Sequence, residues 1–224
     1  MERKPLRVAI ALSLALALAL ICACAPRFVG EERAKSAGLA LLRQAFGVKA
    51  EDAHVEYFER AGSSVVDNTE VQPGAKPADQ IYIVTISDQT LGADLYYAEV
   101  DAKSGVAYYA TKNEWLLAPL SEDQQQQTTE INNLTDGADA DAAVQNDYTE
   151  HTARNAAMRC FQKEVALISA KGCCRRDNVL SPRVSIGYFV TFADGALYRV
   201  AFSWPAMDLN EVQVLGTEAK GERP

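Results

Sequence analysis

The chain has 224 residues, a formal net charge of −8 and five cysteines. This acidic balance argues against a nucleic-acid-binding protein and against adsorption to anionic lipid, because both partners attract basic surfaces. Its length allows one large or two small domains after an N-terminal apolar run, and 48% hydrophobic residues support a packed core.

The first feature in chain order is an apolar run, Val8–Ala25, with no charged residue. Three basic residues precede it: Arg3, Lys4 and Arg7. A run of about 18 apolar residues is near the shortest that spans a hydrocarbon core as a helix, and preceding basic residues keep that end in the cytoplasm. We predict that residues 1–27 are a signal peptide or membrane anchor. The remainder then lies at the extracytoplasmic face of the cell membrane, anchored or lipidated, or is secreted.

Three fates of this segment stay open. It is retained as a signal anchor, or it is cleaved after Ala25, where Ala23-Cys24-Ala25 has the small-x-small form of a signal-peptidase site. Pro26 directly after the cut disfavours cleavage. The third fate is a lipoprotein, because Leu20–Cys24 resembles a bacterial lipobox in which Cys24 is the lipidation candidate. The residues three and two positions before Cys24 depart from the usual lipobox pattern.

A helix and several strands are predicted for the first half. Glu31–Phe46 has a one-sided apolar stripe of helical spacing, and Gly47 stands where a helix C-terminal glycine is expected. A turn-rich loop is predicted from Gly62 to Asp79. The predicted strands, which are rich in β-branched and aromatic residues, are His54–Glu59, Ile81–Ile86, Leu95–Val100 and Val106–Thr111.

The last two of these strands form a predicted hairpin. If Val100 opposes Val106, Tyr97 faces Tyr109 on one face, and Tyr108 lies on the other face with Ala98. We expect the face of Tyr108 to pack on the helix. A slip of one residue would exchange the two faces.

Residues 119–148 are predicted to be an acidic Gln/Asp-rich linker. They contain the run Gln124–Gln127 and few large apolar residues, so they cannot bury enough surface to fix a structure. Three aspartates, Asp136, Asp139 and Asp141, do not follow the spacing of a calcium-binding loop, so we predict no metal site.

The second half repeats the order of the first. A helix is predicted for Thr149–Ala170, capped by Thr149 or Thr152 and ended by Gly172. Alternation of apolar residues predicts strands after it. These are Val184–Phe192, a strand after the turn Ala193–Gly195 that continues to Trp204, and Glu211–Leu215.

Three cysteines lie outside the N-terminal segment, Cys160, Cys173 and Cys174. An odd number does not suit a simple disulfide framework, and a helix that runs to Ala170 would hold Cys160 too far from the other two. A small hydrophobic core residue is therefore the favoured interpretation of Cys160. No zinc site is predicted, because the spacing of metal-binding cysteines is absent.

The stretch Tyr96–Val106 resembles the closing hairpin of PepSY-type domains, in which a strand ends in an acidic residue, turns through Ala-Lys-x-Gly and resumes. With the helix from Glu31, the likeness covers about residues 31–112. The second half matches only in the order of its elements. The resemblance implies a small α+β fold in exported or membrane-bound bacterial proteins that restrain peptidases or serve the envelope, without shared catalytic residues.

We therefore expect an α+β fold of two small units, each with one helix packed on an antiparallel meander, as in cystatin-like and PepSY-like domains. The expected layout after the N-terminal segment is a PepSY-like domain at 28–118, the linker at 119–148, a second helix-plus-meander domain at 149–216 and a polar tail at 217–224.

The leading functional hypothesis is a non-catalytic bacterial envelope protein, membrane-associated through its N-terminal segment, that binds a protein or peptide and restrains a peptidase. Tyr97 and Tyr109 are the candidate partner surface, because exposed tyrosines are enriched in interfaces. Cross-strand pairing of the two rings is the competing structural interpretation, and it is the favoured one.

Two alternatives are a module that binds an apolar or cell-wall-derived ligand and a carboxylate-dependent hydrolase. The hydrolase would use Glu99 and Asp101 for acid–base work, since the only histidines, His54 and His151, stand in no nucleophile motif. We assign no catalytic residue, no cofactor and no metal, expect no nucleic-acid partner, and leave the oligomeric state open.

Overall fold

The structure is a computed structural model that describes residues 28–59, 79–113, 116–117, 119–134, 137–174 and 184–217. The side chains of residues 137–138, 140–141, 169–174 and 217 are not described. The predicted N-terminal segment 1–27, most of the loop 62–79 and residues 218–224 of the tail lie outside the described residues. No helix in the described ranges is long and apolar enough to cross a membrane.

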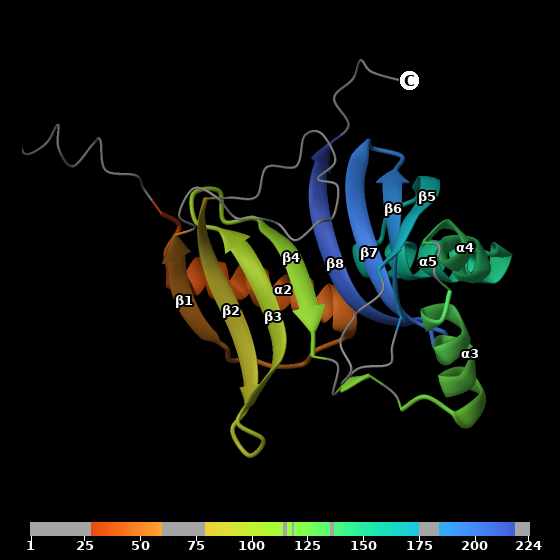
Figure 1. Cartoon of the computed structure of the whole chain (residues 1–224). Coiled ribbons are helices and arrows are strands. Elements are labelled where there is room, and N and C mark those ends of the chain that lie inside the picture. Colours follow the sequence, from red (N-terminus) through yellow and green to blue (C-terminus); the bar gives the residue numbers. More distant parts are fainter. Residues whose placement is uncertain are drawn as a thin grey trace, which may run out of the picture.

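One antiparallel sheet of eight strands organises the described part of the chain, in the order β1-β2-β3-β4-β8-β7-β6-β5 (Figure 1). The first half supplies β1 (His54–Glu59), β2 (Gln80–Asp88), β3 (Ala93–Asp101) and β4 (Ala107–Lys112). The second half supplies β5 (Val165–Cys174), β6 (Val184–Phe192), β7 (Ala196–Trp204) and β8 (Asp208–Thr217). The two halves meet where β4 pairs with β8.

Two long helices lie on the same face of this sheet, α2 (Glu31–Phe46) behind β1–β4 and α5 (Asp147–Phe161) behind β5–β8 (Figure 1). The buried side chains of both helices and of the central strands belong to one continuous core. The expected α+β class is thus confirmed. Each half contributes one of the long helices and four of the described strands, but they share a sheet and a core, so the described residues do not divide into the two predicted units.

Helix α2 occupies the predicted range. Its buried residues, Ala34, Gly38, Leu41, Leu42 and Ala45, form the apolar stripe that the sequence spacing indicates. Gly47 ends the helix in the left-handed conformation with φ of 70°, and its N–H binds the carbonyl of Arg43. The stripe lies against β2–β4, where Val84, Val100 and Ala110 are fully buried.

Helix α5 is shorter than predicted. It ends at Phe161, with Gln162 in the left-handed conformation, and residues 165–170 begin the strand β5 instead of continuing the helix to Ala170. Gly172, the predicted helix end, lies inside β5. The prediction was wrong because Val165 and Ile168, three residues apart, fit the apolar face of a helix as well as a strand. Pairing of these residues with β6 stabilises the strand.

The predicted linker is also partly wrong. It contains helix α3 (Glu122–Asn132), which begins at a capping box formed by Ser121 and Gln124, and helix α4 (Gly137–Val144). Thr128, Ile131 and Val144 are buried, and both helices contact the β5–β6 end of the sheet. Packing of these few buried side chains and contact with the sheet therefore stabilise two helices in a segment whose composition alone does not predict them.

The hairpin β3–β4 has a register that differs from the prediction. Val100 pairs with Ala107, and a β-bulge follows, so that Glu99 pairs with Tyr109 and Tyr97 with Thr111. Ala98 and Ala110 face α2 as expected. The bulge turns Tyr108 to the opposite face, where its hydroxyl reaches Glu99, so the predicted packing of Tyr108 on the helix is wrong.

The start of α5 gives a first testable prediction. Asn146 is the N-cap, and its side chain and the buried hydroxyl of Thr149 form a reciprocal capping box. The Thr149 hydroxyl also donates to the carbonyl of Val144, at 3.0 Å. We expect Thr149→Val to lower the free energy of unfolding by about 1–3 kcal/mol, because buried groups lose their partners.

The matched control is Thr129→Val on α3, whose hydroxyl also bonds a helix carbonyl but is exposed to water. Urea unfolding followed by circular dichroism should show a change within about 0.5 kcal/mol for this variant. Equal losses in the two variants would contradict the role given to Thr149.

Candidate functional site

A groove opens where the two halves of the chain meet. It has a volume of about 650 Å³, within the range of roughly 300–1,000 Å³ that is usual for ligand sites. Its walls are the last turn of α2, one side of α5, the end of β4, and the start of β8 with the residues before it. We call it the seam groove; it is lined by residues 43–47, Lys112, Thr152, Asn155, Ala156, Arg159, Phe202 and 207–209.

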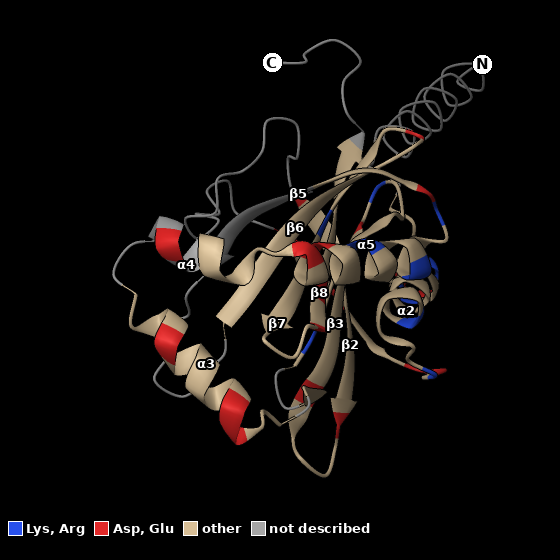
Figure 2. Cartoon of the chain, turned by 90° about the vertical axis from the view of Figure 1, so that its right-hand side faces the viewer, with Lys and Arg blue, Asp and Glu red and all other residues tan. Residues whose placement is uncertain are grey.

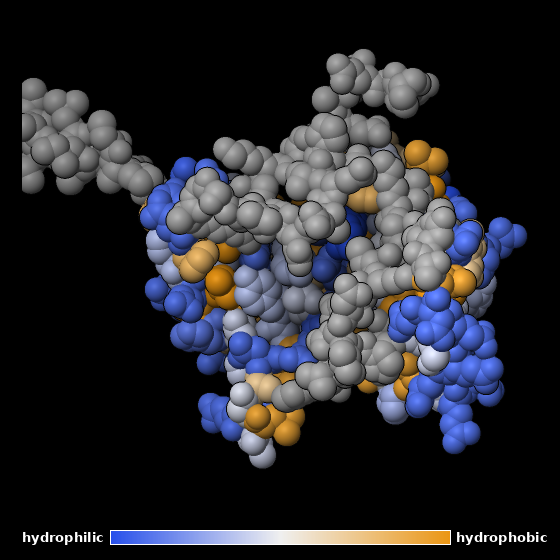
Figure 3. Space-filling model, in the orientation of Figure 1, coloured by the Kyte–Doolittle hydropathy of each residue, from blue (hydrophilic) through white to orange (hydrophobic). Residues whose placement is uncertain are grey.

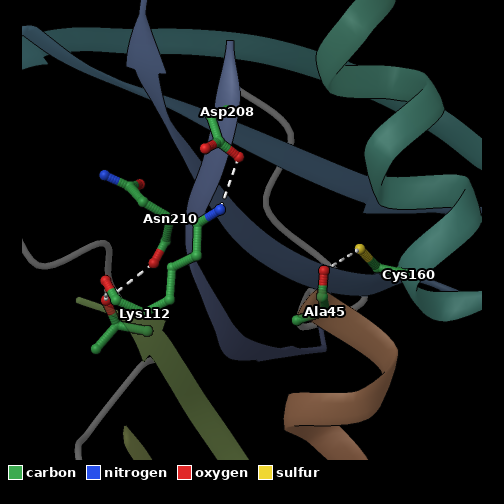
Figure 4. A network of polar contacts seen from close by, with 6 residues as sticks. Ala45, Lys112, Cys160, Asp208 and Asn210 are labelled. Carbon is green, nitrogen blue, oxygen red and sulfur yellow. Dashed lines mark hydrogen bonds and ion pairs between the residues drawn. The ribbon is translucent and has the colours of Figure 1, made fainter. Parts of the chain in front are cut away.

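The floor of the seam groove consists of buried apolar side chains. Phe202 is 1% exposed, and Met207 and Leu209 are each 7% exposed. On the helix side, the thiol of Cys160 donates to the carbonyl of Ala45 at 3.7 Å, which joins the last turns of α2 and α5 (Figure 4). These contacts hold both helix ends in fixed positions beside the groove.

Cys160 is a free, buried thiol, as the favoured interpretation predicted. Burial raises its pKa, and a thiol that stays protonated is a poor nucleophile. The side chains of Cys173 and Cys174 lie outside the described part of the structure. Cys160 therefore serves the packing between the helices and brings no chemistry to the groove.

The charged side chains of the groove are mostly basic. Lys112 forms an ion pair with Asp208 at 2.7 Å (Figure 4), so these two charges offset each other. Arg43 and Arg159 are exposed, and neither has an ion-pair partner among the described residues. Figure 2 shows basic positions on α2 and α5 and acidic ones on α3, α4 and the first turn of α5. The groove is thus a locally positive site on an acidic protein.

The other face of the sheet, turned away from α2, carries polar side chains at the seam, and hydrophilic residues are frequent over β1–β4 in Figure 3. The guanidinium of Arg199 donates to Glu211, and the hydroxyl of Tyr109 donates to the same carboxylate at 3.2 Å. Arg199 lies across Gly187, where a Cβ would come within 3.1 Å of its Nε. This cluster joins β4, β8, β7 and β6.

Tyr97 and Tyr109, the predicted partner surface, are half-buried side chains on this face. Their ring centroids are 6.0 Å apart in an edge-to-face arrangement. The hydroxyl of Tyr97 donates to Glu99 at 2.8 Å, and Tyr109 donates to Glu211 as above. Both rings therefore contribute to the packing of the sheet, while their contact with a partner stays a prediction.

Glu99 and Asp101, the two carboxylates considered for acid–base catalysis, have different hydrogen-bond partners. Glu99 is 7% exposed and accepts hydrogen bonds from Tyr97 and Tyr108. Asp101 instead binds the backbone N–H groups of Lys103 and Ser104 in the β3–β4 turn. His54 and His151 are exposed on β1 and α5, respectively. These four groups thus lie in different local environments, and the hydrogen bonds described above join none of them to another.

Sequence reasoning missed the groove residues Arg43, Lys112, Arg159 and Asp208. Each of them is an ordinary charged residue in its local pattern. Only the pairing of β4 with β8 and the contact of α2 with α5 bring them together. The one available signal was that both arginines stand in the last turn of an amphipathic helix.

Two tyrosines of the sheet, Tyr109 on β4 and Tyr188 on β6, give a second prediction. Burial, and secondarily Glu211, raises the pKa of Tyr109 above its ordinary value, and burial also raises that of Tyr188. As pH rises through about 10, the unfolded chain ionises its tyrosines before the folded protein does. Stability should therefore fall above that pH, and Tyr109→Phe should reduce the fall.

Urea midpoints at about pH 8 and pH 11 would measure this effect, since the ordinary tyrosine pKa lies between them. The control is Tyr148→Phe, because Tyr148 is 68% exposed. If both variants lose stability at alkaline pH as the parent protein does, Tyr109 is not the group responsible.

Comparisons with known proteins add little to this geometry. No family model matches the chain, and no curated protein matches it. Among solved structures, the Bacillus megaterium YpeB C-terminal domain aligns with 88% of this chain and 68% of its own chain, at 10% identity and a TM-score of 0.42. At that similarity we infer neither fold nor function from the alignment.

Proposed function

We propose that this protein is a non-catalytic binding module of the bacterial envelope, membrane-associated through residues 1–27, which binds a protein or peptide partner. The single observation that carries the binding role is the seam groove, which combines buried apolar side chains at its floor with two arginines that form no ion pair with any described residue. Charged and polar side chains line most of the groove, and such groups orient a bound ligand. The extracytoplasmic location is supported by the basic residues that precede Val8–Ala25.

Three further elements of the proposal remain as the sequence suggested them. The likeness of residues 31–112 to PepSY-type domains supports a role in restraining a peptidase. Cys24 is the proposed lipidation site if the N-terminal segment is of the lipoprotein type. The non-catalytic character is supported by the separate engagement of Glu99 and Asp101 with neighbouring groups.

A groove-filling substitution tests the binding role. The full chain in detergent micelles is screened against a library of short synthetic peptides, and bound peptides are measured again with Asn155→Trp. Asn155 is an exposed residue in the lining, so an indole there should occupy the groove without disturbing the core. We expect this variant to lose at least tenfold in affinity, which is about 1.4 kcal/mol.

The matched control is Met158→Trp, which places the same side chain at an exposed position of α5 outside the lining. It should bind peptides as the parent protein does. Absence of any peptide binding, or equal binding by the Asn155 variant, would contradict the proposal. Preferential binding of cell-wall fragments over peptides would favour the alternative ligand class.

A further inference from the structure

The positions of Arg43 and Arg159, which form no ion pair with any described residue, indicate which group of a ligand the seam groove binds. Arg43 lies in the last turn of α2, two residues before Ala45. Arg159 lies in the last turn of α5, directly before Cys160. Both arginines line the seam groove, next to the hydrogen bond from the Cys160 thiol to the Ala45 carbonyl. No described acidic residue forms an ion pair with either arginine.

The C-terminal ends of the two helices offset part of this positive charge. The exposed carbonyls of each end carry about half a negative elementary charge, so the ends of α2 and α5 together offset about one of the two guanidinium charges. Lys112 and Asp208 cancel each other. About one positive charge is left without a counterpart among the residues that the structure describes. That balance suits a singly charged anion better than a phosphate dianion.

Guanidinium groups favour one chemical class among such anions. Arginine matches a carboxylate in shape and binds it through two parallel hydrogen bonds. The buried floor of Phe202, Met207 and Leu209 lies in the same groove. The C-terminal residue of a peptide carries a carboxylate and a side chain on one carbon atom, so it can place the former at the rim and the latter on the floor.

We propose that the seam groove binds the free C-terminal carboxylate of a peptide, with Arg43 and Arg159 at the carboxylate and the terminal apolar side chain on the floor. This inference rests on the proposed function, because it assigns the part of a peptide that the groove recognises. It also predicts preference for newly cut peptide ends over internal segments, since only an end has this carboxylate.

The test compares two ligands that differ in one group. N-acetylated tetrapeptides that end in leucine, one as the free acid and one as the amide, are titrated into the full chain in detergent micelles, with NMR shifts as the readout. We expect the acid to bind at least tenfold more tightly than the amide. In the double variant Arg43→Gln with Arg159→Gln, this ratio should fall to near one.

The control variant is Lys49→Gln, because Lys49 is an exposed cation just after α2 that lies outside the lining. It should keep the ratio. Equal binding of acid and amide by the parent protein would overturn the carboxylate proposal and leave the binding role intact. If neither peptide binds, and the library screen also finds nothing, the binding role itself fails. Tighter binding of inorganic phosphate than of acetate would also overturn the choice of a single carboxylate.

Discussion

Glu211→Ala should destabilise the protein by about 2–3 kcal/mol, because it leaves a largely buried guanidinium without its partner. The side chains of Arg199 and Glu211 are 18% and 22% exposed, so the loss should lie below that of a fully buried pair. The Tyr109 hydroxyl loses its acceptor in the same variant. The substitution thus weakens β4–β8 pairing, which joins the halves of the sheet.

Equilibrium unfolding in urea measures this loss, and a double-mutant cycle with Arg199→Met assigns it. Removal of both charges should cost less than the sum of the single changes, because no unpaired ion remains. Glu56→Ala is the control, since Glu56 is an exposed glutamate on the strand β1. A parent-like midpoint for Glu211→Ala would show that the cluster does not stabilise the seam.

The second large effect is expected at Gly38, where α2 comes closest to the sheet. A Cβ at this position would lie 2.7 Å from Cγ2 and 2.8 Å from Cβ of Val84, closer than real atoms approach. Gly38→Ala gains about 1 kcal/mol in helix propensity, but overpacking of a filled core costs about 1–3 kcal/mol. Because Val84 is β-branched and fully buried, it cannot turn away, so we expect a net loss of stability.

A larger side chain sharpens this test. Gly38→Leu should lose more stability than Gly38→Ala, and thermal melts would rank the two. Ser36→Ala is the control on the exposed face of the same helix, where propensity alone acts and stability should rise slightly. Combining Gly38→Ala with Val84→Ala should be less harmful than the two separate losses predict, because it removes Cγ2 and also Cγ1, which would lie 3.0 Å from the added Cβ. A stabilised Gly38→Ala variant would contradict the close approach.

Local sequence patterns predicted those elements whose ends carry a chemical signal. Helix α2 has an unbroken apolar stripe and a terminal glycine, and the structure gives it the predicted bounds. Strand β6 alternates without interruption between residues 184 and 192, and its bounds also agree. Helix α5 was extended too far because its end is Gln162, a residue that gives no signal for the left-handed conformation it adopts.

The remaining differences come from contacts between distant residues. The bulge that turns Tyr108 toward Glu99 is set by strand pairing, which hydrophobic alternation alone does not reveal. The pairing of β4 with β8 joins residues about one hundred positions apart, such as Thr111 and Glu211. The seam groove arises from this pairing, and therefore its residues could not be found by scanning the sequence for local motifs.

The position of β8 has a consequence for how the chain reaches its native state. This strand follows β7 in sequence, yet it lies in the middle of the sheet, between β4 and β7. A polypeptide that emerges amino end first must wait for residues 208–217 before β4 and β7 gain a shared neighbour. Until then, both strands present unsatisfied edges that could pair with another nascent copy. Association between nascent chains should therefore be most frequent just before the residues of β8 become available.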